Sequence, residues 1–339
     1  MIRERRSRSK GLFIMRNPVI WQRPDLLLPQ PFDSIFFDVD GVLIQTTNSF
    51  RVANIATTEY IVGELYKLDW GQHEGKELVT LNDIELFKQA GGFNSDWDMC
   101  YLLTSLATAR LREWQASSLA ERTVAEWAAL ARVASLQGHG GRRWVEEVFP
   151  ASARPDYKQV IDVFNEFYWG TDELQKRMGH APEYVAYSEG FVHKEEMLYA
   201  PDFFARLRKA GIVHLGMITG RTGVEVDSAV ERMEAYSGER WWDVVISADT
   251  HIKPDPQALR AAIEAVGTRG GLYIGDTADD FDLVRRYRAE NGNEGREERD
   301  KPAILAAMVV HASDEEIYKQ RGADILVRSV EDLLALLPV

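Results

Sequence analysis

The stretch Ser34-Ile-Phe-Phe-Asp38-Val-Asp40-Gly41-Val-Leu43 decides the fold of this 339-residue chain. A short apolar run that ends in Asp-Gly predicts a buried β-strand with two aspartates at its carboxyl end. Residues two apart on a strand share a face, so Asp38 and Asp40 can point the same way. Two adjacent anions repel unless a cation joins them, and Mg²⁺, which prefers oxygen ligands, would do so. An ordinary Asp-Gly turn, in which Gly41 lets the chain bend sharply, would explain the same letters without a metal.

The sequence around this strand changes character twice. Residues 1–33 carry four prolines between positions 18 and 31, and we expect an extended or disordered lead-in. From 46 to 199, apolar residues recur at helical spacing between glycine-rich breaks, which predicts a helical block. From 200 onward, apolar runs typical of strands alternate with helical patterns, which predicts parallel strands joined by crossover helices.

One strand therefore precedes the helical block and the others follow it. The later strands are expected at residues 213–219, 244–248, 272–275, 304–310 and 325–327, with helices at 201–210, 222–236, 255–266, 279–289 and 330–337. We predict an α/β fold with a doubly wound parallel sheet, built from residues 34–45 and 200–339, and an all-helical domain of residues 46–199 inserted after the first strand. Ligands of such sheets bind beyond the carboxyl ends of the strands.

Polar residues stand at three further predicted strand ends or helix entrances. Ile218-Thr219-Gly220-Arg221 offers a hydroxyl and backbone amides that suit a phosphate, although a simple helix cap explains them too. Lys253-Pro-Asp-Pro256 holds its lysine on a stiffened segment, as a fixed charge for a phosphate or as an ordinary solvated lysine. Gly275-Asp276-Thr-Ala-Asp279-Asp280 concentrates three carboxylates, and helix capping explains their position but not their density.

Taken in order, these four segments resemble the motifs of the haloacid dehalogenase superfamily of phosphohydrolases. The matches are Asp38-x-Asp40-Gly-Val-Leu, Thr219, Lys253 and Gly275-Asp276-x-x-x-Asp280, and they span residues 34 to about 282. The helical block stands where the helical-cap branch of the superfamily, subfamily I, carries its cap. Two segments of that block, Ser49-Phe-Arg51 and Gly91-Gly-Phe-Asn-Ser-Asp-Trp97, resemble a subgroup of phosphatase-like proteins in this branch.

The resemblance implies a magnesium-dependent phosphatase that works through an aspartyl phosphate. Asp38 would be the nucleophile, while Asp40 would protonate the leaving oxygen and then accept a proton from water. Mg²⁺ would be bound by Asp38, the backbone carbonyl of Asp40 and Asp276, with Asp280, or alternatively Asp279, as the outer acid of the metal site.

Substrate contacts are implied at two places. Thr219, Gly220 and Lys253 would hold the phosphoryl group, with Thr219 and Lys253 counted among the catalytic residues. In the helical block, we expect Arg51, Asn94 and Asp96 to contact the rest of the substrate. Alternatively, Arg51 pairs with a carboxylate of the block, Asn94 and Asp96 cap a helix, and neighbouring Trp97 packs in the core.

Asp40 separates the alternative activities. The dehalogenases of the superfamily lack this second acid, so phosphoryl chemistry is favoured, with phosphomutase and phosphonate hydrolysis still open. A non-catalytic binding module would be expected to have lost Asp38 or Asp40, and both are present.

Composition restricts the partners. The net charge is −13, although residues 1–16 hold six basic side chains and one acidic one, so the remaining chain is strongly acidic. A nucleic-acid surface needs basic groups, and a membrane span needs about 20 consecutive apolar residues, which no stretch approaches. A single cysteine, Cys100, excludes an internal disulfide. We expect a cytoplasmic protein that acts on a small phosphorylated metabolite and binds neither nucleic acid nor membrane. The basic start is expected to be a disordered extension; a tail for nucleic acid or membrane, an untranslated leader before Met15 and a transit-like segment are the alternatives.

Overall fold

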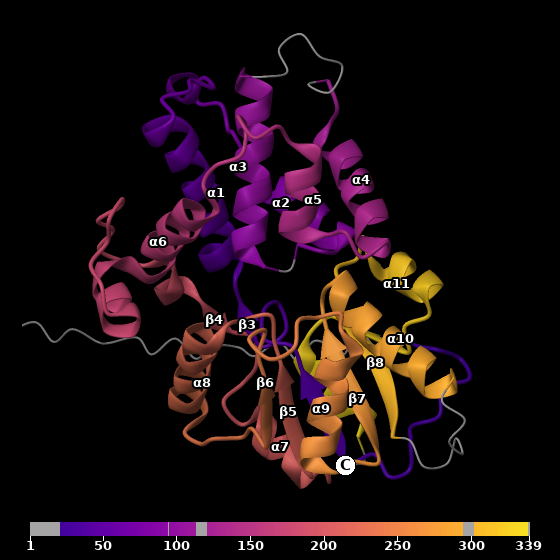
Figure 1. Cartoon of the computed structure of the whole chain (residues 1–339). Helices are drawn as coiled ribbons and strands as arrows, with labels where there is room; N and C mark the ends of the chain where they lie inside the picture. The colour runs from indigo at the N-terminus through magenta and orange to yellow at the C-terminus, as the bar shows by residue number, and fades with distance from the viewer. Residues whose placement is uncertain (1–20, 94, 113–120, 294–301, 338–339) are drawn as a thin grey trace, which may run out of the picture.

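A seven-stranded sheet forms the base of the molecule (Figure 1). The structure is a computed structural model that describes residues 21–93, 95–112, 121–293 and 302–337. The strands follow the order β1-β9-β8-β7-β2-β5-β6, and every neighbouring pair is parallel except β1 with β9. The strand bounds are β1 Trp21–Gln22, β2 Ser34–Phe37, β5 His214–Ile218, β6 Val244–Ile246, β7 Gly270–Gly275, β8 Ala303–Val309 and β9 Ile325–Val327.

Strand β2 lies inside the sheet because it is apolar enough to be covered on both faces. All four of its residues are buried, and it pairs with β5 on one side and β7 on the other. Its last residue, Phe37, lies opposite Met217 of β5 and Ile274 of β7. The three parallel strands are therefore aligned, and the residues that follow each of them lie together at the carboxyl edge of the sheet.

Helices cover both faces of the sheet, as a doubly wound fold requires. Side chains of α7 and α8 pack into one apolar cluster with Ile35 and Phe37 of β2, whereas side chains of α9, α10 and α11 pack into the other with Phe36. The helix bounds are α7 Phe203–Lys209, α8 Gly223–Ser237, α9 Pro256–Val266, α10 Ala278–Asn293 and α11 Glu315–Arg321, followed by a 3₁₀ helix at Val330–Leu336.

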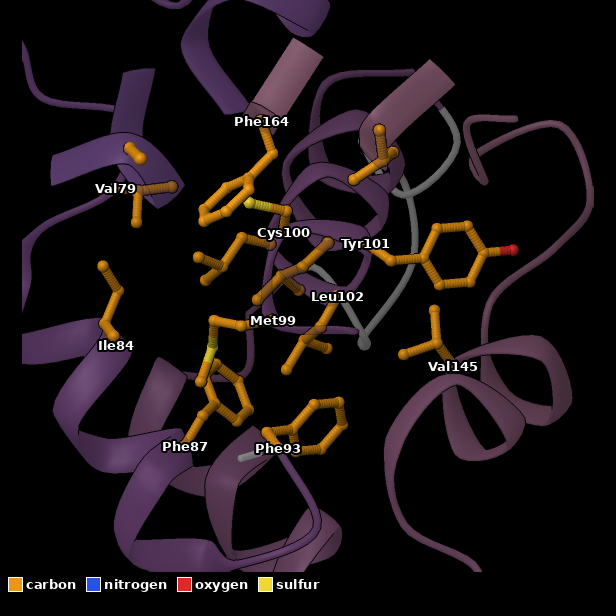
Figure 2. Packing of buried hydrophobic residues seen from close by; sticks show 14 of the residues in the cluster. Val79, Ile84, Phe87, Phe93, Met99, Cys100, Tyr101, Leu102, Val145 and Phe164 are labelled. Carbon is orange, nitrogen blue, oxygen red and sulfur yellow. The ribbon is translucent and has the colours of Figure 1, made fainter. Parts of the chain in front are cut away.

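Six helices between β2 and β5 stand above the carboxyl edge of the sheet (Figure 1), and we call them the cap helices. They are α1 Val52–Glu59, α2 Leu81–Ala90, α3 Asp96–Arg112, α4 Val124–Leu136, α5 Gly141–Val148 and α6 Tyr157–Met178, with π-helical turns at Thr47–Arg51 and Tyr60–Leu65 and short 3₁₀ helices at Gln72–Glu74 and Phe191–Lys194. Helix α3 is buried continuously from Met99 to Ala109. Figure 2 shows its residues Met99 to Leu102 packed among side chains of neighbouring cap segments. The cap helices thus carry a hydrophobic core of their own.

The predicted α/β fold is confirmed, and the sequence missed mainly short elements. Strand β1 lies within the stretch expected to be extended, and α11 was not predicted. Helix α10 continues to Asn293, four residues beyond the end of the helix expected at 279–289. Two further short strands, β3 Ile44–Gln45 and β4 Glu196–Met197, form an antiparallel ribbon where the chain leaves the sheet and returns to it. The domain boundaries at 45/46 and 199/200 stay a prediction.

Within the described ranges, no helix combines the length and the apolar character that crossing a membrane would need.

Candidate active site

Asp38 follows β2 directly and is almost completely buried at the edge of the sheet. Its Oδ1 lies 2.7 Å from Nζ of Lys253, whose side chain is buried as well. Burial, reinforced by the charge of Asp280, raises the pKa of Asp38 well above its usual range, against the opposing effect of Lys253. The fold therefore places Asp38 where burial favours its neutral form and Lys253 only partly offsets that effect.

Lys253 joins two carboxylates. Its Nζ lies 2.7 Å from Asp38 Oδ1 and 2.7 Å from Asp280 Oδ1, and it donates to the Tyr273 hydroxyl at 3.3 Å. Burial alone would lower the pKa of Lys253, but Asp280 and Asp38 outweigh it and raise the pKa above its ordinary value. The lysine is thus a fixed positive charge, held on the segment that Asp255 ends by capping α9.

Asp38, Asp276 and Asp280 bring carboxylate oxygens within 4.8 Å of one another. Asp280 is fully satisfied, because Lys253 and Tyr273 donate to Oδ1 and the residues at 276 and 277 donate to Oδ2. Burial alone would raise the pKa of Asp280, but these contacts hold it below its usual value. Asp280 is therefore the charged, immobile member of the group.

Asp276 is the member with room for a ligand. Burial, followed by the charge of Asp280, raises the pKa of Asp276 to about 7. Its Oδ1 is buried and has no hydrogen-bond partner among the described residues, which is costly unless something else satisfies it. Gly41 makes this position possible: its φ is +78°, and a Cβ there would lie 2.0 Å from Asp276 Oδ2. Three carboxylates with one unsatisfied oxygen fit a hard divalent cation.

The side chain of Asp40 does not join this acidic group, although the sequence allowed both aspartates to point the same way. The chain turns at Gly41, and the Asp40 carboxylate pairs with Arg221 instead. Arg221 donates to Asp40 Oδ1 from Nε at 3.0 Å and from Nη2 at 2.7 Å. The two aspartates are thus held by separate cations, Lys253 and Arg221.

Thr219 and Gly220 follow β5 beside Asp38 on the sheet edge. Thr219 is buried, and its Oγ1 accepts a hydrogen bond from the Arg221 backbone N–H at 3.1 Å. Gly220 lines a cavity of about 740 Å³ that also reaches Asp38, Asp40 and Lys253.

The cap helices supply the other wall of this cavity. Arg51 and Asp96 both line it, but each has a partner: Arg51 pairs with Glu85 at 2.7 Å, and Asp96 accepts from Asn54 Nδ2 at 2.7 Å and lies 3.3 Å from Lys88. Asn94 lies outside the described residues. Trp97 is part of the wall and packs on the cap core. Among the alternatives, Arg51 does pair with a carboxylate, and Asp96 begins α3.

Asp279 lies apart from the acidic group, although it lines the cavity. Burial raises its pKa to about 6, and a backbone hydrogen bond from Gly92 opposes the rise. Of the two candidate outer acids, Asp280 is the one that lies with Asp38 and Asp276.

A known protein family matches the part of the chain that contains these site residues. The family model for haloacid dehalogenase-like hydrolases matches residues 32–285, which is most of the sequence. The chain belongs to the haloacid dehalogenase-like hydrolases. Members of this family generally use Mg²⁺, and the acidic group of Asp38, Asp276 and Asp280 can hold such an ion.

Several solved structures resemble this chain to different degrees. Phosphatase Tt82 from Thermococcus thioreducens is 25% identical, with a TM-score of 0.52 over 89% of this chain and 97% of its own. A structural-genomics target, 15% identical, has a TM-score of 0.53 over 90% of this chain and 98% of its own, and shares the fold. A phosphonoacetaldehyde hydrolase-like protein from Oleispira antarctica is 14% identical, with a TM-score of 0.46 over 93% and 95% of the two chains. A search of curated proteins found no match.

In this haloacid dehalogenase-like site, sequence reasoning missed the partners of Asp40. Arg221 stands in the quoted segment Ile218-Thr-Gly-Arg221, yet no role was assigned to it. Its contacts Glu195 and Tyr168 come from distant parts of the chain. No local sequence pattern identifies Glu195 or Tyr168 as a contact of Arg221. Glu195 directly precedes β4 and Tyr168 lies on α6, and only the folded chain brings them to Arg221.

Proposed function

We propose that this protein is a magnesium-dependent phosphatase that hydrolyses a small phosphorylated metabolite through an aspartyl phosphate on Asp38. The observation that carries the proposal is that two aspartates line one cavity but pair with different cations. Asp38 sits beside Lys253 and the acidic group, while Asp40 is held by Arg221. Nucleophile and proton carrier can then act independently on one bound phosphate ester. The likeness to a phosphatase of known structure supports the same reaction class.

The first step transfers the phosphoryl group. A carboxylate oxygen of Asp38 attacks phosphorus, the bond from phosphorus to the leaving oxygen breaks, and Asp40 gives its proton to that oxygen. Lys253, Thr219 and the amide of Gly220 hold the phosphoryl oxygens, whose charge must be stabilised in the transition state.

The second step restores the enzyme. Asp40 accepts a proton from a water molecule whose oxygen attacks the phosphorus of the aspartyl phosphate. The acyl–phosphate bond breaks, and inorganic phosphate and the Asp38 carboxylate are released. The sum is the hydrolysis of an ester to an alcohol and phosphate.

Asp38, the backbone carbonyl of Asp40 and Asp276 would hold Mg²⁺, with Asp280 orienting the group. Bound there, the ion supplies positive charge that neutralises the phosphoryl oxygens. The unsatisfied Oδ1 of Asp276 is the observation that supports this assignment.

Asp38→Asn tests the nucleophile. The change is nearly isosteric and removes a buried charge, so we expect a folded protein whose release of phosphate from a panel of phosphorylated metabolites is abolished. Wild-type protein should lose the same activity in excess chelator. Turnover by Asp38→Asn within tenfold of wild type would refute the nucleophile, and full activity in chelator, above all with release of halide from a haloacid, would favour the dehalogenase alternative.

A further inference from the structure

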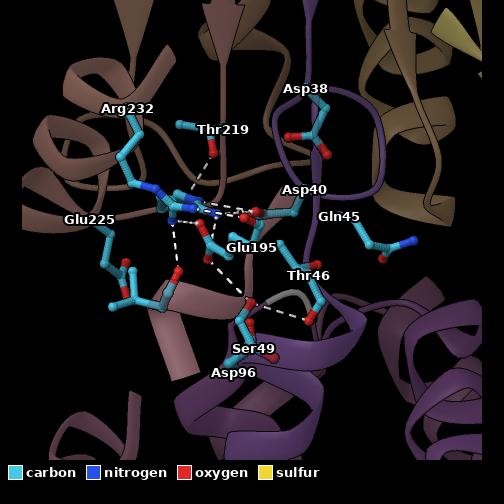
Figure 3. Close-up of polar contacts among 12 residues, drawn as sticks. Asp38, Asp40, Gln45, Thr46, Ser49, Asp96, Glu195, Thr219, Glu225 and Arg232 are labelled. Carbon is cyan, nitrogen blue, oxygen red and sulfur yellow. Dashed lines mark hydrogen bonds and ion pairs between the residues drawn. The ribbon is translucent and has the colours of Figure 1, made fainter. Parts of the chain in front are cut away.

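A buried carboxylate, Glu195, lies where the cap helices meet the core (Figure 3). Its Oε1 accepts from Ser49 Oγ at 3.2 Å, Tyr168 OH at 2.9 Å and Arg221 Nη2 at 3.1 Å. Its Oε2 accepts from Arg232 Nη1 at 2.6 Å. Two donors therefore come from the cap side and two from helix α8 and the loop before it.

Arg221 connects this carboxylate to the candidate active site. Its side chain is 1% exposed, and the same Nη2 that binds Glu195 also binds Asp40 Oδ1. The guanidinium carbon of Arg221, Cζ, lies 4.9 Å from the centroid of the Phe50 ring, and the Tyr168 hydroxyl lies 3.5 Å from Arg221 Nη1. Charges alternate along this line from Arg232 through Glu195 and Arg221 to Asp40.

Burying the two central charges of this line, Arg221 and Glu195, is energetically costly, and stability alone does not explain it. Well-placed partners must offset the desolvation energy of a buried arginine, and apolar side chains of similar volume often stabilise a core equally well. Burial would lower the pKa of Arg221, but Asp40 and Glu195 raise it well above its ordinary value, so the guanidinium stays charged. What the network provides is geometry, because a planar guanidinium with fixed partners has one orientation.

We propose that Arg221 is a positioning residue for Asp40 and that Glu195, with Tyr168, fixes Arg221 against the cap. Both guanidinium hydrogen bonds go to Oδ1, which leaves Oδ2 to carry the proton into the cavity. Because Tyr168, Ser49 and Phe50 lie on the cap side, the proton carrier is fully oriented when the cap is seated on the core.

This inference rests on the proposed role of Asp40, and a leaving-group comparison tests both. An alkyl phosphate releases a strongly basic alkoxide that needs a proton, whereas a nitrophenyl phosphate releases a stable phenolate that does not. The ratio of kcat/KM for the two esters reports proton delivery in the phosphoryl-transfer step. Asp40→Asn sets the reference, with an alkyl ester slowed at least tenfold more than the nitrophenyl ester.

Arg221→Gln, Glu195→Gln and Tyr168→Phe should shift the ratio in the same direction, the tyrosine variant least. Arg221→Lys should recover part of it, since lysine keeps the charge but not the planar fork. The matched control is Glu166→Gln. Glu166 is a second buried carboxylate; it lies on α6, and its oxygens accept hydrogen bonds from the backbone N–H groups of residues 183–185 rather than from Arg221. It should leave the ratio at the wild-type value.

The outcomes separate the two proposals. If Asp40→Asn shifts the ratio while the folded Arg221→Lys, Glu195→Gln and Tyr168→Phe variants slow both esters equally or only lower Tm, the positioning role is wrong and the phosphatase proposal stands. If Asp40→Asn itself leaves the ratio unchanged, the proton-carrier role fails and the positioning role fails with it.

Discussion

Gly41 shows how one residue can decide whether the acidic group can form. Its φ of +78° disfavours any side chain, and a Cβ would lie 2.0 Å from Asp276 Oδ2. We expect Gly41→Ala to abolish Mg²⁺-dependent turnover, because Asp276 must move. The backbone alone should cost about 1–2 kcal/mol of unfolding free energy.

Gly238 provides the control for this prediction. Its φ is +80°, and a Cβ there would meet nothing within 4 Å. Gly238→Ala should therefore lose comparable stability, measured by chemical denaturation, and keep its turnover. Equal activity in the two variants would contradict the role of Gly41 at the site.

At the level of single residues, the sequence located candidates better than it located their contacts. Asp38 and Asp276 were identifiable because they come at the ends of apolar runs, and Lys253 because it begins a proline-stiffened turn. Parallel strands bring such ends together. The direction of the Asp40 side chain was not predictable, since it depends on Arg221. Glu195 was invisible, because a glutamate before a two-residue strand carries no pattern.

Helix α8 begins with a capping box that a buried carboxylate completes. The backbone N–H and the hydroxyl of Thr222 donate to Glu225 Oε2 at 2.8 and 2.9 Å. Burial, outweighing these hydrogen bonds, raises the pKa of Glu225 from 4.5 to about 7. The folded state therefore binds this proton more tightly than the unfolded state, so the contribution to stability is present below pH 4.5 and is lost as pH rises towards 7.

Glu225→Gln keeps an oxygen that can accept in the capping box and removes the titration. We expect it to be more stable than wild type at pH 8 by up to about 3 kcal/mol, with little difference at pH 4.5. Chemical denaturation at both pH values measures this. Glu126→Gln is the control, because hydrogen bonds from Thr123 lower the pKa of exposed Glu126 in the capping box of α4. Its effect should have the opposite sign, and parallel trends would contradict the assignment.

Elements were predictable from the sequence where they were long or fully apolar. Strands β2, β5 and β7 were found because each is a buried run, and the order of strands and helices implied the doubly wound sheet. Strands β1, β3 and β4 have two residues each, too few for any alternation, and they form because another segment already lies beside them.

Across the whole molecule, the acidic group couples metal binding to stability. Burial raises the pKa of Asp276 to about 7, and the pKa of Asp38 is raised as well, so protons compete with a cation for this group. Without metal, the stability that protonated Asp276 contributes is lost as pH rises through about 7. We expect Mg²⁺ to raise Tm more at pH 8 than at pH 6.

Asp276→Asn should remove most of that Mg²⁺-dependent rise, and Ca²⁺ should support turnover poorly because it prefers more ligands at longer distances. Thermal unfolding with and without each ion, at both pH values, gives the measurement. A rise in Tm that is equal at pH 6 and pH 8, or unchanged in Asp276→Asn, would place the cation elsewhere.

Because cap residues line one wall of the cavity, we propose that the cap helices distinguish the substrate from other phosphate esters. Arg51 lines this cavity, and its charge opposes the rise that burial and Asp280 cause in the pKa of Asp276, so Arg51 acts on the site electrostatically even while it pairs with Glu85. Arg51→Ala should lower kcat/KM at least tenfold for the native metabolite but much less for a small generic ester, which lacks the remote groups that the cap would bind. Glu85→Gln breaks the same ion pair and leaves the cation in the cavity, so it should retain the native reaction. If both variants lose activity equally on both substrates, with a matching fall in Tm, then Arg51 serves to hold the cap together and substrate selection lies with other residues of the cavity wall.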